Sequence, residues 1–438
     1  MFFKGAEMTD KEKTILDYHR GGKISLGMPR RLDSVDDLCL AYTPGVATAV
    51  KAIAADPPTA FDYTAKGGLV AVVSDGTAIL GLGDLGPAAA IPVMEGKAVL
   101  FKSFANVNAW PVVLDHCREG GASTGPTDPQ RVIDAVMAIA PMYGGINLED
   151  IAAPACFEIE DRLADMLDIP VFHDDQWGTA VIVLAGVTNY AHLVGKPMES
   201  LKVVINGAGA AGTRIREMLM AGGVKRVVMC DSKGVIYTGR PINKSRHDKV
   251  AVDTPLRTLD QVMVGADVFV GVSKGDCVKP EWVASMADQP AIFALANPDP
   301  EVSPGAVAAA MGGRPYVMAT GRSDFPNQIN NVLCFPFLFR GALDVRATKI
   351  TRHMKIAASN ALAQAARRPA SAATRALYPG ESLEFGPDYI IPKPFDGDIY
   401  VDVASAVAEA AVADGVARIE GFDPAAYRAK LSAEKPRA

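Results

Sequence analysis

The sequence has no excess of basic residues, since 44 Lys and Arg stand against 50 Asp and Glu for a net charge of −6. That charge disfavours nucleic acid or an anionic membrane as the main partner. Its six cysteines are scattered without close pairs, which argues against a disulfide framework or a zinc site. No stretch of membrane-spanning length is free of Gly, Pro and charge, and the N-terminus lacks an export signal. We therefore expect a soluble cytoplasmic protein.

What the sequence does contain is enough apolar material for a large core. Hydrophobic residues make up 49% of the 438 residues, and a chain of this length is expected to form two or three domains. Apolar strand-like runs such as 68–73 and 110–115 alternate with helical spacing, which predicts an α/β fold. We expect a substrate and metal domain over 1–177 and a Rossmann-type dinucleotide-binding domain over 178–330, inserted into the first or following it. A helical segment over 331–438 is expected to pack back on the first domain.

A glycine-rich turn gives the clearest functional signal. It follows the apolar run 201–205, opens a helix-like stretch, and leads to a second apolar run that ends on Asp231, about 20 residues further on. Glycines at such a turn let the backbone approach a pyrophosphate, and the helix N-terminus attracts its charge. Asp231 can bond the adenosine ribose. The predicted cofactor-binding residues of the turn are Gly207, Ala208, Gly209, Ala210, Ala211 and Gly212.

A second match to the same glycine pattern, residues 81–86, lacks this context because Pro87 follows at once. One interpretation is a tight connection between two elements. The other, which we favour, is a glycine loop that lines a substrate or nicotinamide pocket, because the flanking segments also carry polar groups suited to chemistry.

Two acidic pairs lie directly after or beside apolar segments: Glu149-Asp150 and Asp174-Asp175. Three or four carboxylates that meet at a domain edge would form a hard oxygen site for Mg²⁺ or Mn²⁺. The alternative is that each pair occupies a solvated turn.

Two further side chains are candidates for proton transfer. Lys97 interrupts an apolar stretch, and a desolvated lysine beside a cation has a lowered pKa and can act as a base. The alternative is a surface lysine whose stem covers apolar neighbours. Tyr42 lies just before a turn, and its alternative is a half-buried core tyrosine.

Taken together, these segments resemble the malic enzymes over nearly the whole chain. The match is to the short bacterial form and to the malic-enzyme half of hybrids with a phosphotransacetylase-like C-terminal domain. The segments that carry the resemblance are 42–47, 80–86, 94–97, 147–150, 172–175, the Rossmann glycines, 294–298, 321–331 and 385–396.

The resemblance implies oxidative decarboxylation of (S)-malate to pyruvate and CO₂, with reduction of NADP or NAD and a requirement for Mg²⁺ or Mn²⁺. It assigns Glu149, Asp150 and Asp175 to the metal. Lys97 would take the proton of the C2 hydroxyl, and Asp174 would support this base and the metal ligands.

In the same family, the residue at Tyr42 would protonate C3 of the enolate. Asn297 and Asn331 would hold the substrate carboxylate and the nicotinamide side of the cleft, so Asn297 counts as both a cofactor and a substrate residue. Malic enzymes form dimers in which a neighbour can complete the active site, so a homodimer or higher homo-oligomer is expected. Non-redox decarboxylation of oxaloacetate, a malolactic-type activity or a catalytically silent sensing module remain as alternatives.

Some residues depart from the family pattern. Long-form relatives carry an arginine just before the 81–86 loop, where residues 76–79 of this chain contain none, and short forms usually have histidine where it has Trp177. Asn106 and Asn108 replace the usual Gly and Asp. Substrate preference or rate could therefore differ.

The nucleotide preference rests on the end of the second Rossmann strand. Asp231 would repel a 2′-phosphate and favour NAD, whereas Ser232 and Lys233 could bind that phosphate. The stretch 230–234 resembles the NADP-using hybrids, so NADP is preferred.

Overall fold

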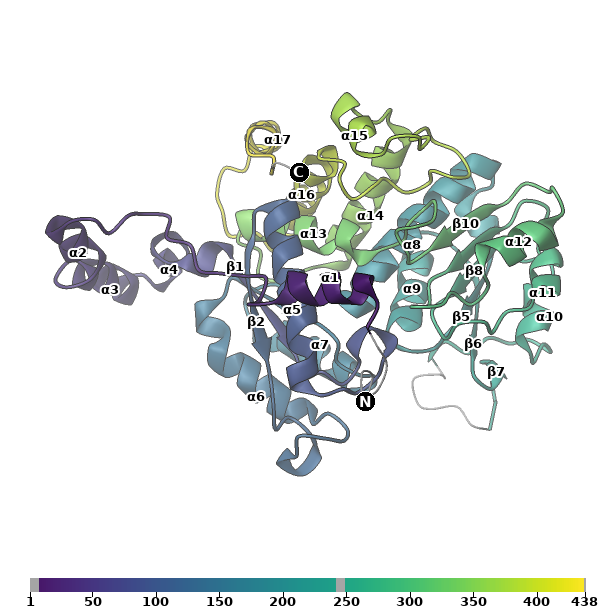
Figure 1. Ribbon diagram of the computed structural model, residues 1–438, viewed down its shortest axis with the longest axis horizontal. Helices are drawn as coiled ribbons and strands as arrows, with labels where there is room; N and C mark the ends of the chain where they lie inside the picture. Colours follow the sequence, from purple (N-terminus) through teal and green to yellow (C-terminus); the bar gives the residue numbers. More distant parts are fainter. Residues whose placement is uncertain (1–7, 242–248, 437–438) are drawn as a thin grey trace.

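The computed structural model describes residues 8–241 and 249–436. Two mainly parallel sheets lie side by side, and a group of C-terminal helices packs across both (Figure 1). This is the mixed α/β architecture expected from the sequence, with a Rossmann-type domain after the first α/β unit.

The first sheet has the order β2-β1-β3-β4, and all its strands are parallel. Its strands are β1 (Leu69–Ser74), β2 (Asn108–Val113), β3 (Gly145–Leu148) and β4 (Val171–His173). Strand β3 was not anticipated, because four residues after two glycines give too short a pattern. Its fully buried position between β1 and β4 brings the residues that follow Leu148 and His173 to the same edge of the sheet.

Helices cover this sheet and precede it. They are α1 (Asp10–His19), α2 (Val35–Ala41), α3 (Val46–Ala55), α4 (Ala60–Tyr63), α5 (Pro87–Ala105), α6 (Pro129–Ile139) and α7 (Ala155–Met166).

The second sheet has the order β10-β9-β8-β5-β6-β7, parallel except for the antiparallel edge strand β7. Its strands are β5 (Lys202–Asn206), β6 (Arg226–Asp231), β7 (Gly234–Val235), β8 (Val268–Gly271), β9 (Ala291–Ala294) and β10 (Val317–Thr320). Its helices are α9 (Ala210–Ala221), α10 (Leu259–Met263), α11 (Pro280–Ala284) and α12 (Pro304–Met311). The chain runs outward from β5 to β6 and then returns to β8, so ligands are expected where β5 meets α9.

The C-terminal helices pack back on the first unit, as predicted. Phe335 and Phe339 of the first of them lie edge-on to Phe101, with ring centroids 4.8 and 5.4 Å apart. These helices are α13 (Phe335–Asp344), α14 (Arg352–Arg367), α15 (Ala372–Leu377), α16 (Asp398–Ala413) and α17 (Pro424–Ala433). Helix α8 (Asp174–Val194) joins the two sheets, and its Asn189 donates hydrogen bonds to the carbonyls of Ala363 (2.9 Å) and Ile390 (2.8 Å).

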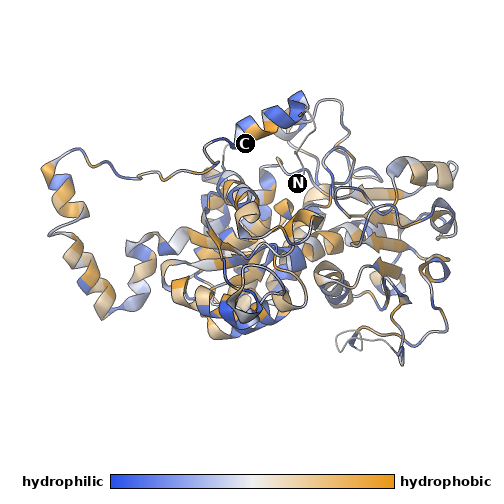
Figure 2. Cartoon of the chain, turned by 60° about the horizontal axis from the view of Figure 1, so that its bottom comes forward, coloured by the Kyte–Doolittle hydropathy of each residue, from blue (hydrophilic) through white to orange (hydrophobic). Residues whose placement is uncertain are grey.

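Two segments, Val35–Ala55 and Asp174–Val194, are long and apolar enough by length and composition to cross a membrane. The second is α8, which is mostly buried and serves as a core helix here. The first comprises α2 and α3, which project from the body as an arm and contain no buried residue (Figure 1). Many of the arm's residues are apolar (Figure 2).

Candidate active site

The two acidic pairs predicted from the sequence meet at the carboxyl edge of the first sheet. Glu149 and Asp150 follow the end of β3, whereas Asp174 and Asp175 form the first turn of α8, directly after β4. Oxygen atoms of Glu149, Asp150 and Asp175 all lie within 4.8 Å of one another. The interpretation of the pairs as solvated turns is wrong for Glu149, Asp150 and Asp174, which are at most 3% exposed.

Lys97 is the cation of this cluster. It lies on α5, and its Nζ is 2.5 Å from Oδ2 of Asp174 and 3.0 Å from Oε1 of Glu149. The side chain is buried over the Phe335 ring, which excludes the alternative of a surface lysine. Burial alone disfavours the ammonium, yet Asp174, Glu149 and Asp175 outweigh it and raise the pKa of Lys97.

The carboxylates carry more negative charge than Lys97 can balance. Burial raises the pKa of Asp150 to about 7 and that of Asp174 to about 6, and it raises the pKa of Glu149 as well. Oδ2 of Asp150, Oδ1 of Asp174 and Oδ1 of Asn147 are buried and have no hydrogen-bond partner among the described residues. Buried carboxylate and amide oxygens without donors, beside the close group of Glu149, Asp150 and Asp175, fit a hard divalent cation such as Mg²⁺ or Mn²⁺.

The loop with the first glycine pattern borders this cluster. The backbone N–H of Ala78 donates to the carbonyl of Asp150 (3.0 Å), and that of Leu80 reaches Oδ1 of Asp150 at 3.5 Å. Asp150 itself has φ of 53° and donates its N–H to Oδ2 of Asp175 (2.8 Å). At Gly76, where φ is 72°, a Cβ would lie 2.4 Å from the carbonyl oxygen of Gly86, so this neck of the loop requires glycine. The loop therefore borders the carboxylate cluster, and its lining of a pocket stays a prediction.

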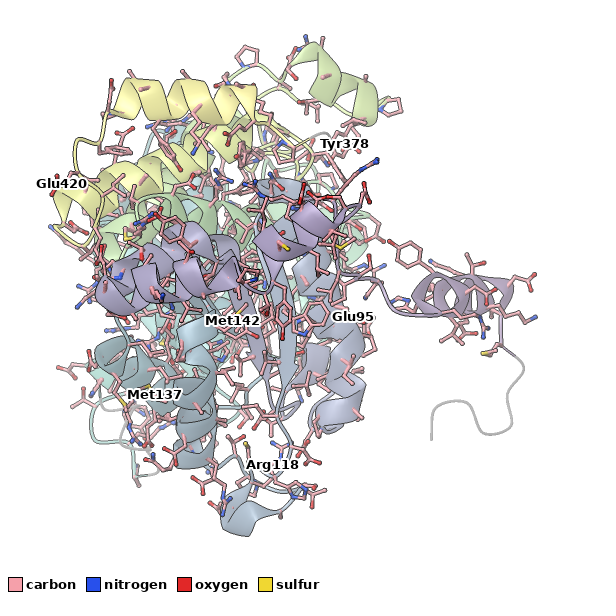
Figure 3. The ribbon with its side chains drawn as sticks, turned by 90° about the vertical axis from the view of Figure 1, so that its left-hand side faces the viewer. Glu95, Arg118, Met137, Met142, Tyr378 and Glu420 are labelled. Carbon is pink, nitrogen blue, oxygen red and sulfur yellow. The ribbon has the colours of Figure 1, made fainter. Side chains whose placement is uncertain are left out.

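A buried arginine, Arg118, forms hydrogen bonds at both ends of the same loop. It donates to Oδ2 of Asp75 (2.9 Å) and to Oδ1 of Asp84 (3.1 Å), and it lies at the lower end of the first domain in Figure 3. Asp75 and Asp84 therefore both engage the guanidinium of Arg118.

The predicted nucleotide turn has the geometry that a pyrophosphate requires. Gly207 has φ of 127°, and a Cβ there would lie 2.4 Å from the carbonyl of Val272. A Cβ on Gly212 would lie 1.9 Å from the Gly207 carbonyl, so both positions exclude side chains. Gly209 borders open space and precedes the first turn of α9, whose free N–H groups can receive a phosphate. The turn therefore fits a dinucleotide.

The acid at the end of β6 has a partner that the sequence did not reveal. Arg240 donates from Nη2 to Oδ2 of Asp231 (2.6 Å) and from Nη1 to Oδ1 (3.0 Å). The backbone N–H of Lys233 donates to the same carboxylate (2.8 Å), and Ser232 and Lys233 are exposed beside it. The charge of Asp231 is thus offset where a ribose 2′-substituent would lie.

The remaining predicted residues lie in three places. Asn331 and Asp174 lie on either side of Gly178, where a Cβ would meet both side chains. Asn297 is exposed just past the end of β9, in the second domain. Tyr42 is 67% exposed at the end of α2, so it is not a half-buried core tyrosine, and α2 projects from the body away from α5, the helix that carries Lys97 (Figure 1).

Fold and site define an α/β protein with a dinucleotide-binding domain and a carboxylate–lysine cluster suited to a divalent metal. Family models identify the same two parts: the malic enzyme N-terminal domain matches residues 26–164, and the malic enzyme NAD-binding domain matches residues 177–382. The chain belongs to the malic enzyme family.

Individual relatives agree with this assignment. An NADP-dependent malic enzyme of Halomonas elongata is 50% identical over 418 residues, which cover 94% of this chain and 96% of the relative. An NADP-dependent malic enzyme of Rhizobium meliloti is 48% identical over 446 residues, which cover 98% of this chain but 57% of that longer protein. The crystal structure of a malic enzyme from Pyrococcus horikoshii, 40% identical, covers 97% of this chain and 95% of its own, with a TM-score of 0.85.

Proposed function

We propose that this protein oxidises (S)-malate to pyruvate and CO₂ with reduction of NADP and with a divalent metal. The observation that carries the proposal is the buried cluster of Lys97 with four carboxylates next to a dinucleotide-binding domain. A silent module would have no need to keep a buried lysine and partnerless carboxylate oxygens together, because burying unpaired charge destabilises a fold.

Each group of the cluster has a distinct task. The divalent ion, held by Glu149, Asp150 and Asp175, would polarise the C2 oxygen and stabilise the charge that develops there, and the nicotinamide would accept the C2 hydride. Lys97 takes the proton of the C2 hydroxyl as the C2–H bond of malate breaks, and a 2-keto acid is formed. The C3–C4 bond then breaks, CO₂ leaves, and the electron pair passes into an enolate that is protonated at C3. Asp174 holds the Lys97 amine in position.

The nucleotide preference follows from Asp231 and its partner. A free carboxylate would repel the 2′-phosphate of NADP, but Arg240 neutralises it, and Lys233 stands next to it at the surface. We infer a preference for NADP.

The test is to incubate the purified protein with (S)-malate, Mn²⁺ and either NADP or NAD, and to measure reduced nucleotide and pyruvate in parallel. Equal amounts of both products, larger with NADP, support the proposal. Pyruvate or lactate from a dicarboxylic acid without reduced nucleotide would indicate the non-redox alternatives instead.

The charge balance and the six free cysteines support a cytoplasmic location.

We further propose a homodimer in which each chain supplies Tyr42 to the other. The observation is that the arm, helices α2 and α3, is largely apolar and contains no buried residue, while Tyr42 at the end of α2 is exposed on this arm, which projects away from α5 (Figure 1). A second copy of this chain explains both facts, because docking would bury the arm and bring a proton donor to the enolate.

Mixing two inactive variants tests this proposal. With Tyr42→Phe and Lys97→Ala chains, exchange at equal amounts should restore roughly a quarter of wild-type activity, because half the dimers are mixed and each holds one intact site. If Tyr42 acted within its own chain, every site would carry one lesion and no activity would return. Sedimentation of the wild type as a monomer would also contradict the dimer.

A further inference from the structure

One arginine joins the nucleotide-binding helix to the helices around the carboxylate cluster. Arg214 lies on α9, just after the glycine turn, with its side chain 14% exposed. Its Nε donates to Oε1 of Gln176 on α8 (3.0 Å), and its Nη2 donates to Oδ1 of Asp161 on α7 (3.0 Å) and to Oε2 of Glu160 (3.4 Å). One guanidinium therefore contacts both neighbouring helices.

The partners of Arg214 flank the acidic pair at the start of α8. Gln176 is the residue after Asp175, and its Nε2 donates to the carbonyl of Cys156 (3.2 Å). Glu160 accepts the backbone N–H of His173, the residue before Asp174, on its other oxygen (3.3 Å). Arg214 thus acts on the chain both before and after the two carboxylates.

Aromatic rings fix the orientation of this guanidinium. Its central carbon lies 4.4 Å from the ring centroid of Trp177 and 5.4 Å from that of Phe157. Lys355 of α14 approaches the Trp177 ring as well, with Nζ 3.3 Å from the centroid. A planar fork with fixed donors stacks on rings and serves several acceptors at once, which a lysine ammonium cannot do. Trp177, where short relatives usually have histidine, therefore supports Arg214.

We propose that Arg214 is a positioning residue that couples dinucleotide binding at the α9 turn to divalent-metal binding at the site that includes Asp175. A pyrophosphate on the N-terminus of α9 would fix that helix, and Arg214 would transmit the constraint through Gln176 and Glu160 to the first turn of α8. By linkage, bound metal tightens nucleotide binding by the same factor. The inference rests on the proposed function, because it takes both ligands as given.

The experiment measures binding rather than turnover. Mn²⁺ affinity is determined from the electron paramagnetic resonance of the free ion, with and without saturating NADP and with malate absent. The variants are Arg214→Met, Arg214→Lys and, as a matched control on the same helix, Arg216→Met. Arg216 is half-buried, and its Nε has no hydrogen-bond partner among the described residues. Thermal melting verifies that each variant is folded.

For the wild type and Arg216→Met, we expect NADP to tighten Mn²⁺ binding by about five- to tenfold. Arg214→Met should reduce that factor to within about twofold of one, and Arg214→Lys should restore it only partly. A purely structural role would lower the melting temperature and leave the factor unchanged. If Arg214→Met does not fold, Gln176→Met breaks the link from the α8 side and gives the same comparison.

Two results would overturn the inference. One is a folded Arg214→Met variant in which NADP tightens Mn²⁺ binding as much as in the wild type, and the other is a wild type in which NADP does not change Mn²⁺ affinity. Wild-type turnover is measured in parallel. If the wild type oxidises malate but either overturning result is found, only the role of Arg214 is contradicted. If the wild type does not oxidise malate, the proposed function is contradicted.

Discussion

The amine of Lys97 lies 2.5 Å from Oδ2 of Asp174, in a site where both side chains are buried. The lysine here serves as counter-charge to a carboxylate cluster. Carboxylates that share their charge with a bound divalent cation hold a lysine proton less strongly, so metal binding would favour the neutral amine that a base requires. This relationship explains how one residue can stabilise the metal-free protein and act as base in the loaded one.

Replacing Lys97 tests both roles. Lys97→Met should lower malate oxidation by about 10²–10⁴-fold while NADP still binds. It should also destabilise the metal-free protein by about 3–5 kcal/mol, because Glu149 and Asp174 lose their buried partner, and Mn²⁺ should return part of that stability. Denaturant unfolding with and without Mn²⁺ measures the second effect. Lys102→Met, on the exposed face of the same helix, is the control. Retained oxidation in the Lys97 variant would exclude it as the base.

Replacing Asp175 tests the metal site. Asp175→Asn keeps the size of the side chain but removes a negative ligand, so we expect the Mg²⁺ or Mn²⁺ concentration for half-maximal rate to rise by at least about tenfold. Asp165→Asn, exposed on α7, should leave it unchanged. Equal metal dependence in the Asp175 variant and the wild type would remove Asp175 from the ligand set.

The pH dependence of metal binding follows from Asp150. Burial raises its pKa to about 7, so the folded metal-free protein keeps a proton there that the unfolded chain releases at about pH 4. Between these values the folded state binds more protons, and the stability of the metal-free protein falls as pH rises. Because a cation needs the carboxylate, Mn²⁺ affinity should increase up to about pH 7 and release protons on binding. Titration calorimetry in buffers of different ionisation enthalpy measures this, and an affinity independent of pH would contradict it.

Nucleotide selectivity should depend on Arg240. Arg240→Met leaves the carboxylate of Asp231 without its bidentate partner, so the ratio of kcat/KM for NADP to that for NAD should fall by roughly tenfold or more. Asp231→Asn should change the ratio in the opposite direction. The substitution removes the negative charge that repels a 2′-phosphate, and it also removes a carboxylate that accepts a hydrogen bond from the ribose of NAD. Ratios that do not move in opposite directions would contradict this assignment.

The sequence predicted the parts of the site that are carried by local patterns. The glycine turn, Lys97 and the acidic pairs are each visible as residue types next to apolar runs, and parallel strands bring their following residues to one edge. Partners that come from distant segments leave no such pattern. In the sequence, Arg214 and Arg240 resemble ordinary surface arginines. Only the packing of α9 against α7 and α8 brings Arg214 to its partners, and only the return of the chain after β7 brings Arg240 to Asp231.

The arm shows a second limit of prediction from the sequence. The apolar residues of the arm do not tell from sequence whether the surface that covers them belongs to the same chain. The single chain leaves α2 and α3 without buried residues and Tyr42 exposed. The position of a catalytic candidate within one chain therefore had to come from the structure.

The most direct test of the central claim follows one hydrogen atom. (S)-Malate deuterated at C2 is incubated with the protein, Mn²⁺ and NADP, and the products are examined by NMR. We predict deuterium at C4 of the reduced nicotinamide together with an equal amount of pyruvate, because Lys97 takes only the hydroxyl proton. Decarboxylated product without deuterium on the nicotinamide would contradict an oxidative decarboxylase and the roles assigned here to Lys97 and the glycine turn.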